Sequence, residues 1–428
     1  MGLINMKKIF SFLLMIGLLF SNVSGVYAES EGTKLDLNAE AVILMDAVSG
    51  AVLYQKNALK QMEPASITKI MTVYLAITKG DLDASVEVSA EAIDSIDRTS
   101  SHIALDYNEV VQVEDMCYAS LLSSANDASN VLAEHVSGTQ EAFVKLMNET
   151  AVSMGAQDTV FANAHGLPTN DANKPHLTTA YDMALMMKTM IKNETFLKIA
   201  QTTSYTMSAT NKQKENRVFG NGNEMIKKSS YRYEGMIAGK TGWTTDAGYT
   251  YVAAAERDGM QLIVVILNDD SKEDRYQDAK TLFDYGFENY KQVLVKASSL
   301  EPKEVQIMQG SRVAGEFTFS FEHDFNVLLS KNTDESALTT EIIVENEDDL
   351  DKISAKLVLY LNYVPIAEVP MEKQAVIHDL SFKATTLPII LNVLDIFSVA
   401  VMAFFMSLVA YSAYLSNKKK KSLNKKNG

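Results

Sequence analysis

Residues 42–54 read VILMDAVSGAVLY, so that two apolar runs flank the turn residues 46–50. Strand-forming runs on either side of a short turn that contains glycine predict a β-hairpin. A second hairpin is expected far along the chain, from the runs 250–256 and 261–268, which residues 257–260 join. The fold therefore depends on two hairpins that lie far apart in the sequence.

The region between the two hairpins has apolar residues at helical spacing. The expected helices cover residues 70–77, 113–122, 128–136, 142–154 and 179–191, and one more, 274–290, follows the second hairpin. Strands at both ends with helices between them imply one sheet built from distant segments. The prediction is a mixed α/β domain over about residues 36–290, with a helical cluster inserted.

From residue 293 to about residue 381 the pattern changes to short alternating runs separated by turn and charge clusters. The expected strands are 304–308, 316–321, 326–329, 339–344, 355–361 and 366–369. This pattern is typical of a small all-β domain, and a sandwich is the expected architecture. The domain carries no nucleophile motif. A substrate-recognition module and a stalk above a membrane both fit it.

The N-terminus has the three-part layout of a secretory signal peptide over residues 1–28. Lys7 and Lys8 precede an apolar run, residues 9–20, and a small-residue site ends at Ala28. We expect cleavage after Ala28, and an uncleaved N-terminal anchor is the alternative interpretation.

Near the C-terminus, residues 387–415 form an apolar run long enough to cross a bilayer, interrupted by Asn392, Asp395 and a few serines. The tail that follows, residues 416–428, contains six lysines. By the positive-inside rule this tail is cytoplasmic, so the body of the chain lies on the outer face of the cell membrane. An amphipathic helix lying on the membrane surface is the alternative.

The formal net charge of −15 is unevenly distributed. Taking the +2 of residues 1–28 and the +5 of residues 384–428 from that total leaves −22 on residues 29–383. So acidic a body argues against a nucleic-acid partner, which requires a basic face. The single cysteine, Cys117, excludes an intrachain disulfide, and its apolar neighbours predict a buried, inert thiol.

The first motif that carries chemistry is PASITK, residues 64–69, at the expected start of a helix. Ser66 and Lys69 are three apart, so they share a helix face and the amine can lie beside the hydroxyl. A lysine kept neutral by burial and by nearby cations can take the proton of a serine and make it a nucleophile. Taken alone, the spacing also fits an N-capping serine followed by a solvated lysine.

Two further motifs follow in order. In SSANDA, residues 123–128, Ser124 can relay a proton and Asn126 can bind a substrate carbonyl, although alone this is an ordinary helix start. In GKTGW, residues 239–243, a lysine and a threonine can bind a carboxylate. A phosphate loop would need glycine at position 234, which is glutamate, and a helix rather than a strand afterwards, so a nucleotide site is rejected.

Together, Ser-x-x-Lys, Ser-x-Asn and Lys-Thr-Gly form the constellation of the penicillin-recognising acyl transferases. The chain resembles the low-molecular-weight penicillin-binding proteins that act as D-alanyl-D-alanine carboxypeptidases, serine peptidases of family S11. The resemblance covers nearly the whole chain and extends to residues 121–128, 161–167, 178–184 and 235–242. It implies an α/β fold of the β-lactamase and penicillin-binding-protein type: an antiparallel sheet with a helical cluster, then a small all-β sandwich domain and a C-terminal membrane helix.

The resemblance also implies roles for individual residues. Ser66 is then the acylated nucleophile, Lys69 its general base and Ser124 a second catalytic residue. The backbone N–H groups of Ser66 and Trp243 form the oxyanion hole. His165 is a candidate for positioning the deacylating water, and a hydrogen-bonded loop histidine is the alternative. The substrate-binding residues are Asn126, Lys240, Thr241, Gly242 and Trp243.

The implied reaction removes the terminal D-Ala from a peptidoglycan stem peptide that ends in D-Ala-D-Ala. Attack on the penultimate carbonyl releases D-Ala and leaves an ester on Ser66, which water hydrolyses. A β-lactam antibiotic resembles this substrate and is expected to inhibit by acylating Ser66. No cofactor is implied.

Three positions qualify the resemblance. Ala125 stands where many relatives have glycine, a small change. Gly222, within Asn221-Gly222-Asn223, stands where some relatives have an arginine that binds the terminal carboxylate. Carboxylate binding is therefore expected from Lys240 and Thr241, with Arg217 as a further candidate. Asp182 lies three residues after Thr179 and is expected at a helix N-terminus rather than in the mechanism.

Several rivals share part of this pattern. A class A β-lactamase needs a glutamate followed four residues later by asparagine before the third motif, and none is present. An endopeptidase acting on peptide cross-links would use the same chemistry and stays open. A catalytically silent protein that binds the cell wall or senses β-lactams is also an open alternative, although the intact motifs argue against it. The six histidines show no HExxH and no paired spacing, so no metal site is expected.

Overall fold

The computed structural model describes residues 34–169, 171, 173–309, 312–361 and 364–377. These residues form two compact units, one of residues 34–47 and 52–291, and one of residues 48–51 with the described residues from Gln292 onward. The expected signal peptide, membrane helix and basic tail lie outside the described residues. Within the described ranges, no helix combines the length and the apolar character that a membrane span needs.

The first unit is built on a five-stranded antiparallel sheet with the strand order β2-β1-β9-β8-β7. Both expected hairpins are confirmed, and they pair with each other through β1 and β9, as the two-hairpin prediction requires. Strand β7 carries the third motif and has a free edge in this sheet. The strands are β1 (Ala41–Asp46), β2 (Val52–Lys56), β7 (Met236–Thr244), β8 (Gly248–Arg257) and β9 (Met260–Asp269).

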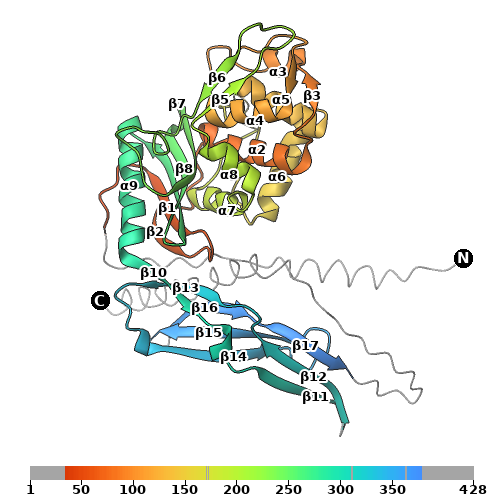
Figure 1. Cartoon of the computed structure of the whole chain (residues 1–428), viewed down its shortest axis with the longest axis vertical. Helices are drawn as coiled ribbons and strands as arrows, with labels where there is room; N and C mark the ends of the chain where they lie inside the picture. The colour runs from red at the N-terminus through yellow and green to blue at the C-terminus, as the bar shows by residue number, and fades with distance from the viewer. Residues whose placement is uncertain (1–33, 170, 172, 310–311, 362–363, 378–428) are drawn as a thin grey trace, which may run out of the picture. The chain divides into compact units, whose positions relative to one another are not determined.

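Helices cover both faces of this sheet, and each expected helix is present (Figure 1). Helix α9 lies on one face, against β9 and β8, and the helical cluster lies beyond the other face. The expected α/β class with an antiparallel sheet is confirmed. The helices are α2 (Lys69–Lys79), α4 (Val113–Leu122), α5 (Asn126–Ser137), α6 (Gln140–Ser153), α7 (Ala180–Met190) and α9 (Lys272–Asn289).

In the first unit, two short helices and four short strands were not expected from the sequence. The helices are α3 (Ala90–Asp94) and α8 (Glu194–Gln201). The strands form two small antiparallel pairs, β3 with β4 and β5 with β6, which lie against the helical cluster. Their bounds are β3 (Ser85–Glu87), β4 (Val110–Gln112), β5 (Ser204–Met207) and β6 (Arg217–Gly220).

The second unit consists of strands joined by turns and two short 3₁₀ segments, η2 (Ala297–Ser299) and η3 (Glu335–Ala337). Its sheets have the orders β11-β12-β17, β14-β15-β16 and β10-β13. One apolar cluster joins Phe317 and Phe319 to Ala355, so the first two sheets pack on each other. The strands are β10 (Tyr290–Val295), β11 (Lys303–Gln309), β12 (Arg312–Ser320), β13 (Phe325–Ser330), β14 (Leu338–Glu345), β15 (Ser354–Leu361), β16 (Val364–Pro370) and β17 (Glu372–Ile377).

Candidate active site

Ser66 and Lys69 lie side by side where the chain enters helix α2. Ser66 is in a 3₁₀ turn, η1 (Ala65–Thr68), and Lys69 is the first residue of α2. The Lys69 Nζ is 3.0 Å from the Ser66 Oγ, as the three-residue spacing predicts. It also donates to the Asn126 Oδ1 at 2.7 Å and to the backbone carbonyl of His165 at 2.5 Å. The first and second motifs therefore meet at one amine.

The Lys69 side chain has no solvent-exposed surface. Burial, helped by the positive charge of Lys240, holds the pKa of Lys69 well below its usual value, and Asp127 opposes this only in part. A neutral amine has two N–H donors and one lone pair. With Asn126 and His165 accepting its two protons, its lone pair is left to receive the proton of Ser66.

Ser124 and Lys240 form a second pair opposite the first. Ser124 lies between α4 and α5 with a φ of +59°, a left-handed conformation that is uncommon for a non-glycine residue. The Lys240 Nζ donates to the Ser124 Oγ at 3.2 Å and to the Thr241 carbonyl at 2.7 Å. Burial and the nearby Arg275 lower the pKa of Lys240 to about 7. This lysine can therefore exchange protons near neutral pH.

Asn126 begins helix α5 and is almost fully buried. Besides accepting from Lys69, its side chain donates to the Ser100 Oγ at 2.8 Å. The neighbouring carboxylate of Asp127 accepts from the backbone N–H groups of Ile103 and Leu105. The second motif thus also holds the segment 100–105. No motif in the sequence includes Ser100.

Strand β7 passes very close to the nucleophile, and glycine makes this possible. A Cβ on Gly242 would lie 2.9 Å from the Ser66 backbone nitrogen and 2.3 Å from the Thr250 Oγ1. The strand could not approach Ser66 with a larger residue at 242. The next residue, Trp243, has a side chain that is 57% exposed.

Arg275 fixes this strand from behind, and the sequence did not point to it. Its guanidinium, on α9, is buried and donates to the carbonyls of Gly242 at 3.1 Å and Thr250 at 3.4 Å. It also lies over the rings of Tyr249 and Tyr276. Arg275 therefore supports the backbone of the third motif and places positive charge near Lys240.

His165 contributes its backbone carbonyl to the site. Its ring is nearly buried, and its Nδ1 accepts from the Leu167 N–H at 3.2 Å. Burial and the Lys69 charge hold the pKa of His165 well below its usual value, so the ring is neutral. These contacts are those of a hydrogen-bonded loop histidine, and its water-positioning role stays a prediction.

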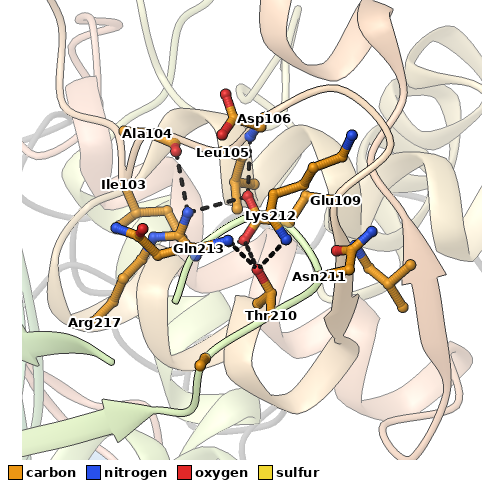
Figure 2. A network of polar contacts seen from close by, with 12 residues as sticks. Ile103, Ala104, Leu105, Asp106, Glu109, Thr210, Asn211, Lys212, Gln213 and Arg217 are labelled. Carbon is orange, nitrogen blue, oxygen red and sulfur yellow. Dashed lines mark hydrogen bonds and ion pairs between the residues drawn. The ribbon is translucent and has the colours of Figure 1, made fainter. Parts of the chain in front are cut away.

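Arg217 is engaged elsewhere. Its guanidinium forms an ion pair with Glu109, with N···O distances of 2.6 and 3.0 Å, and donates to the Ala104 carbonyl at 3.1 Å (Figure 2). The Glu109 side chain is fully buried and also accepts from Thr210 at 2.7 Å. An arginine held by a buried carboxylate is a poor candidate for binding a substrate carboxylate, so this expectation is not supported.

Two other expectations concern residues outside the reacting groups. Cys117 is buried, and its apolar surroundings raise the pKa of its thiol. Asp182 lies in the first turn of α7, where its backbone N–H donates to the capping Thr179. Both residues therefore have the structural roles that the sequence predicts. Among the described residues, no group of three or more His, Cys, Asp or Glu side chains could hold a metal ion.

Comparison with known proteins agrees with this geometry. Residues 27–271 match the S11 peptidase family described as D-alanyl-D-alanine carboxypeptidase. The D-alanyl-D-alanine carboxypeptidase DacF of Bacillus subtilis is 30% identical over 367 residues, which are 82% of this chain and 87% of that protein. DacC of Escherichia coli is 35% identical over 267 residues, 60% of this chain and 63% of that protein.

Solved structures of penicillin-binding proteins are also similar to this chain. Penicillin-binding protein 5 from Haemophilus influenzae is similar with a TM-score of 0.66 and 27% identity, covering 80% of this chain and 98% of that one. The family match spans the sheet and helices that bring Ser66, Lys69, Ser124, Asn126 and Lys240 together. The chain belongs to the D-alanyl-D-alanine carboxypeptidase family of serine peptidases.

Proposed function

We propose that this chain removes the terminal D-Ala from peptidoglycan stem peptides through an acyl-enzyme on Ser66. The observation that carries the proposal is the buried Lys69 amine, which lies 3.0 Å from the Ser66 hydroxyl and also donates to Asn126 and to the His165 carbonyl. Lys69 takes the proton of Ser66, and the Ser66 Oγ attacks the carbonyl of the penultimate residue.

Ser124 and Lys240 complete the proton path. The leaving D-Ala amine needs a proton, and the Ser124 hydroxyl can give one while Lys240 replaces it, since the two lie 3.2 Å apart. A lysine whose pKa is about 7 can perform this exchange near neutral pH. Before this transfer, the protonated Lys240 and the Thr241 hydroxyl bind the terminal carboxylate.

The oxyanion that forms during attack is bound by the backbone N–H groups of Ser66 and Trp243. The close approach of β7 to Ser66, which Gly242 permits, supports this assignment because both N–H groups then border one site. A β-lactam binds in the same way and acylates Ser66.

The location of the enzyme is part of the proposal. The leader of residues 1–28 and the apolar run of residues 387–415 followed by lysines support export and anchoring at the outer face of the cell membrane. There the catalytic unit meets its substrate, the cell wall.

The test is to incubate the full-length chain with a labelled penicillin and with a peptide that ends in D-Ala-D-Ala. We expect a covalent adduct, mapped by mass spectrometry to the peptide containing Ser66, and release of free D-Ala. An adduct on another residue would contradict the mechanism. Cleavage of cross-linked dimers in preference to the linear peptide would instead identify an endopeptidase.

The pH dependence of acylation tests the role of Lys69. Lysine accepts a proton only when it is neutral, that is, above its pKa, and the pKa of Lys69 is lowered. The acylation rate with penicillin should therefore rise with pH and reach its plateau well below pH 10.5, the usual lysine value. Rates measured from pH 5 to 10, with circular dichroism to verify the fold, check this. A single rise centred at the usual lysine value would show that the base is not a buried lysine.

A further inference from the structure

His176 belongs to none of the three motifs, yet it contacts the turn that carries the nucleophile. It lies 108 residues after Thr68, and its Nε2 is 2.8 Å from the Thr68 Oγ1. The ring is 5% exposed and packs edge-on against Phe161. Its neighbour Leu177 pairs with Val160, and Thr178 pairs with Met62. His176 is thus held between two segments that border the site.

The hydrogen bonds of His176 assign its tautomer. The Nδ1 accepts from the Ala162 backbone N–H at 3.0 Å, so it carries no proton. Burial and the Lys69 charge lower the pKa of His176 to about 3, so the ring is neutral and its one proton is on Nε2. The Nε2–H therefore donates to the Thr68 Oγ1, and the Thr68 hydroxyl donates to the Ala65 carbonyl at 2.9 Å.

The carbonyl at the end of this chain belongs to a strained residue. Ala65 directly precedes Ser66 and has a φ of +50°, the left-handed region that non-glycine residues avoid. Gly166 packs against it so closely that a Cβ there would lie 1.9 Å from the Ala65 oxygen. The preceding carbonyl, of Pro64, accepts from the Thr250 Oγ1 at 2.8 Å. Two successive peptide groups before Ser66 are therefore held by side-chain hydroxyls, that of Thr250 from β8 and that of Thr68 from the same turn.

We propose that His176 is a positioning residue for acylation: through the Thr68 hydroxyl it holds the Ala65 carbonyl, and so the backbone that presents the Ser66 Oγ and N–H to the substrate. This inference rests on the proposed role of Ser66 as the nucleophile. His176 touches none of the reacting groups, so it acts on the rate of acylation rather than on the initial binding of ligand.

The test compares near-isosteric variants of the full-length chain. Thr68→Val removes the hydroxyl at constant volume, and Thr68→Ser retains it. We expect Thr68→Val and His176→Phe each to lower the acylation rate constant with a chromogenic β-lactam by about 10- to 100-fold, because small displacements of reacting groups have effects of this size. The dissociation constant of the preceding non-covalent complex should change less than about twofold, and Thr68→Ser should stay within about threefold of the wild type.

The double variant that combines Thr68→Val with His176→Phe distinguishes one continuous chain of hydrogen bonds from two contacts that act independently. If His176 acts through Thr68, the double variant should be no slower than the slower single variant, because either substitution already breaks the chain. Losses that multiply would overturn the inference, as would a Thr68→Val rate equal to that of the wild type. A wild type that takes up no β-lactam would refute the proposed function instead.

A spectroscopic measurement does not depend on activity. With ¹⁵N-labelled histidine, the ring of His176 should show the Nε2–H tautomer and no titration between pH 5 and 9. Thr68→Val should shift its Nε2 signal, and Thr68→Ser should shift it far less. A ring protonated on Nδ1, or one that titrates in this range, would contradict the assigned chain of hydrogen bonds.

Discussion

Lys69→Ala is expected to lower the rate of Ser66 acylation by roughly 10³-fold, the usual contribution of a general base. The amine removed contacts both the Ser66 hydroxyl and Asn126, and burial holds its pKa well below the usual lysine value. Without it, the serine must lose its proton to water. The measurement is the rate of labelled-penicillin uptake, followed by the release of D-Ala from the peptide substrate.

Three variants serve as controls for this result. Ser66→Ala defines the background, since no adduct can form. Lys79→Ala removes an exposed lysine from the other end of the same helix and should leave the rate unchanged. Lys69→Arg keeps a positive charge but cannot act as a base. It should be as slow as Lys69→Ala, and an Arg variant that retains most of the activity would mean that Lys69 supplies charge rather than proton transfer.

The neighbouring positions of the candidate reacting groups could be predicted because they are close in the sequence, whereas their roles were implied by the resemblance to the penicillin-binding proteins. Ser66 and Lys69 are brought together by one turn of helix, and Ser124 and Asn126 by one short loop. The pairing of distant hairpins was also predictable, since two short hairpins with apolar faces are stable only in a shared sheet. These features depend on local pattern or on burial alone.

The supporting residues could not be predicted, because only packing between distant segments defines them. Arg275 reaches the third motif from a helix that follows the sheet, and His176 reaches the first motif from a loop. Each is a single polar residue with no periodic signal around it. The short strands β3 to β6 were missed for a related reason, since three or four residues are too few to show an alternating pattern. Helix α8 did carry a usable signal, the capping Asn193 followed by Glu194.

The prediction for Arg217 named the right kind of group, a carboxylate, but the wrong partner. An arginine upstream of the third motif suits a substrate carboxylate, but Arg217 binds the protein's own Glu109, 108 residues earlier in the sequence. The contacts in Figure 2 join β6 to the segment 104–109, which continues into the segment whose Ser100 bonds Asn126. The arginine therefore supports the site from outside rather than binding the substrate.

Arg217→Ala is accordingly expected to destabilise the catalytic unit by roughly 2–3 kcal/mol at pH 7. This is slightly below the usual cost of breaking a buried ion pair, because Glu109 keeps its other hydrogen bonds. Those bonds come from the Thr210 hydroxyl and the Asp106 N–H. The melting temperature should fall by about 5–10 °C. Lys145→Ala breaks an ion pair whose side chains are 79% and 63% exposed, and it should change the stability by less than about 0.5 kcal/mol.

The pH dependence of this loss identifies its origin. In the wild type, burial opposes ionisation of Glu109, but the hydrogen bonds from Arg217, Asp106 and Thr210 outweigh it and the pKa of Glu109 is lowered. A lowered carboxylate pKa contributes stability that is present above the unfolded value and lost as the pH falls through the folded value. Without Arg217, burial prevails and the pKa of Glu109 rises, so the variant loses stability as the pH increases above about 4.5.

The difference in the free energy of unfolding between wild type and Arg217→Ala, measured with urea, should therefore shrink from pH 7 to pH 4. Adding Glu109→Gln to Arg217→Ala should recover part of the stability lost at pH 7. A pH-independent difference would show that Arg217 acts through packing alone.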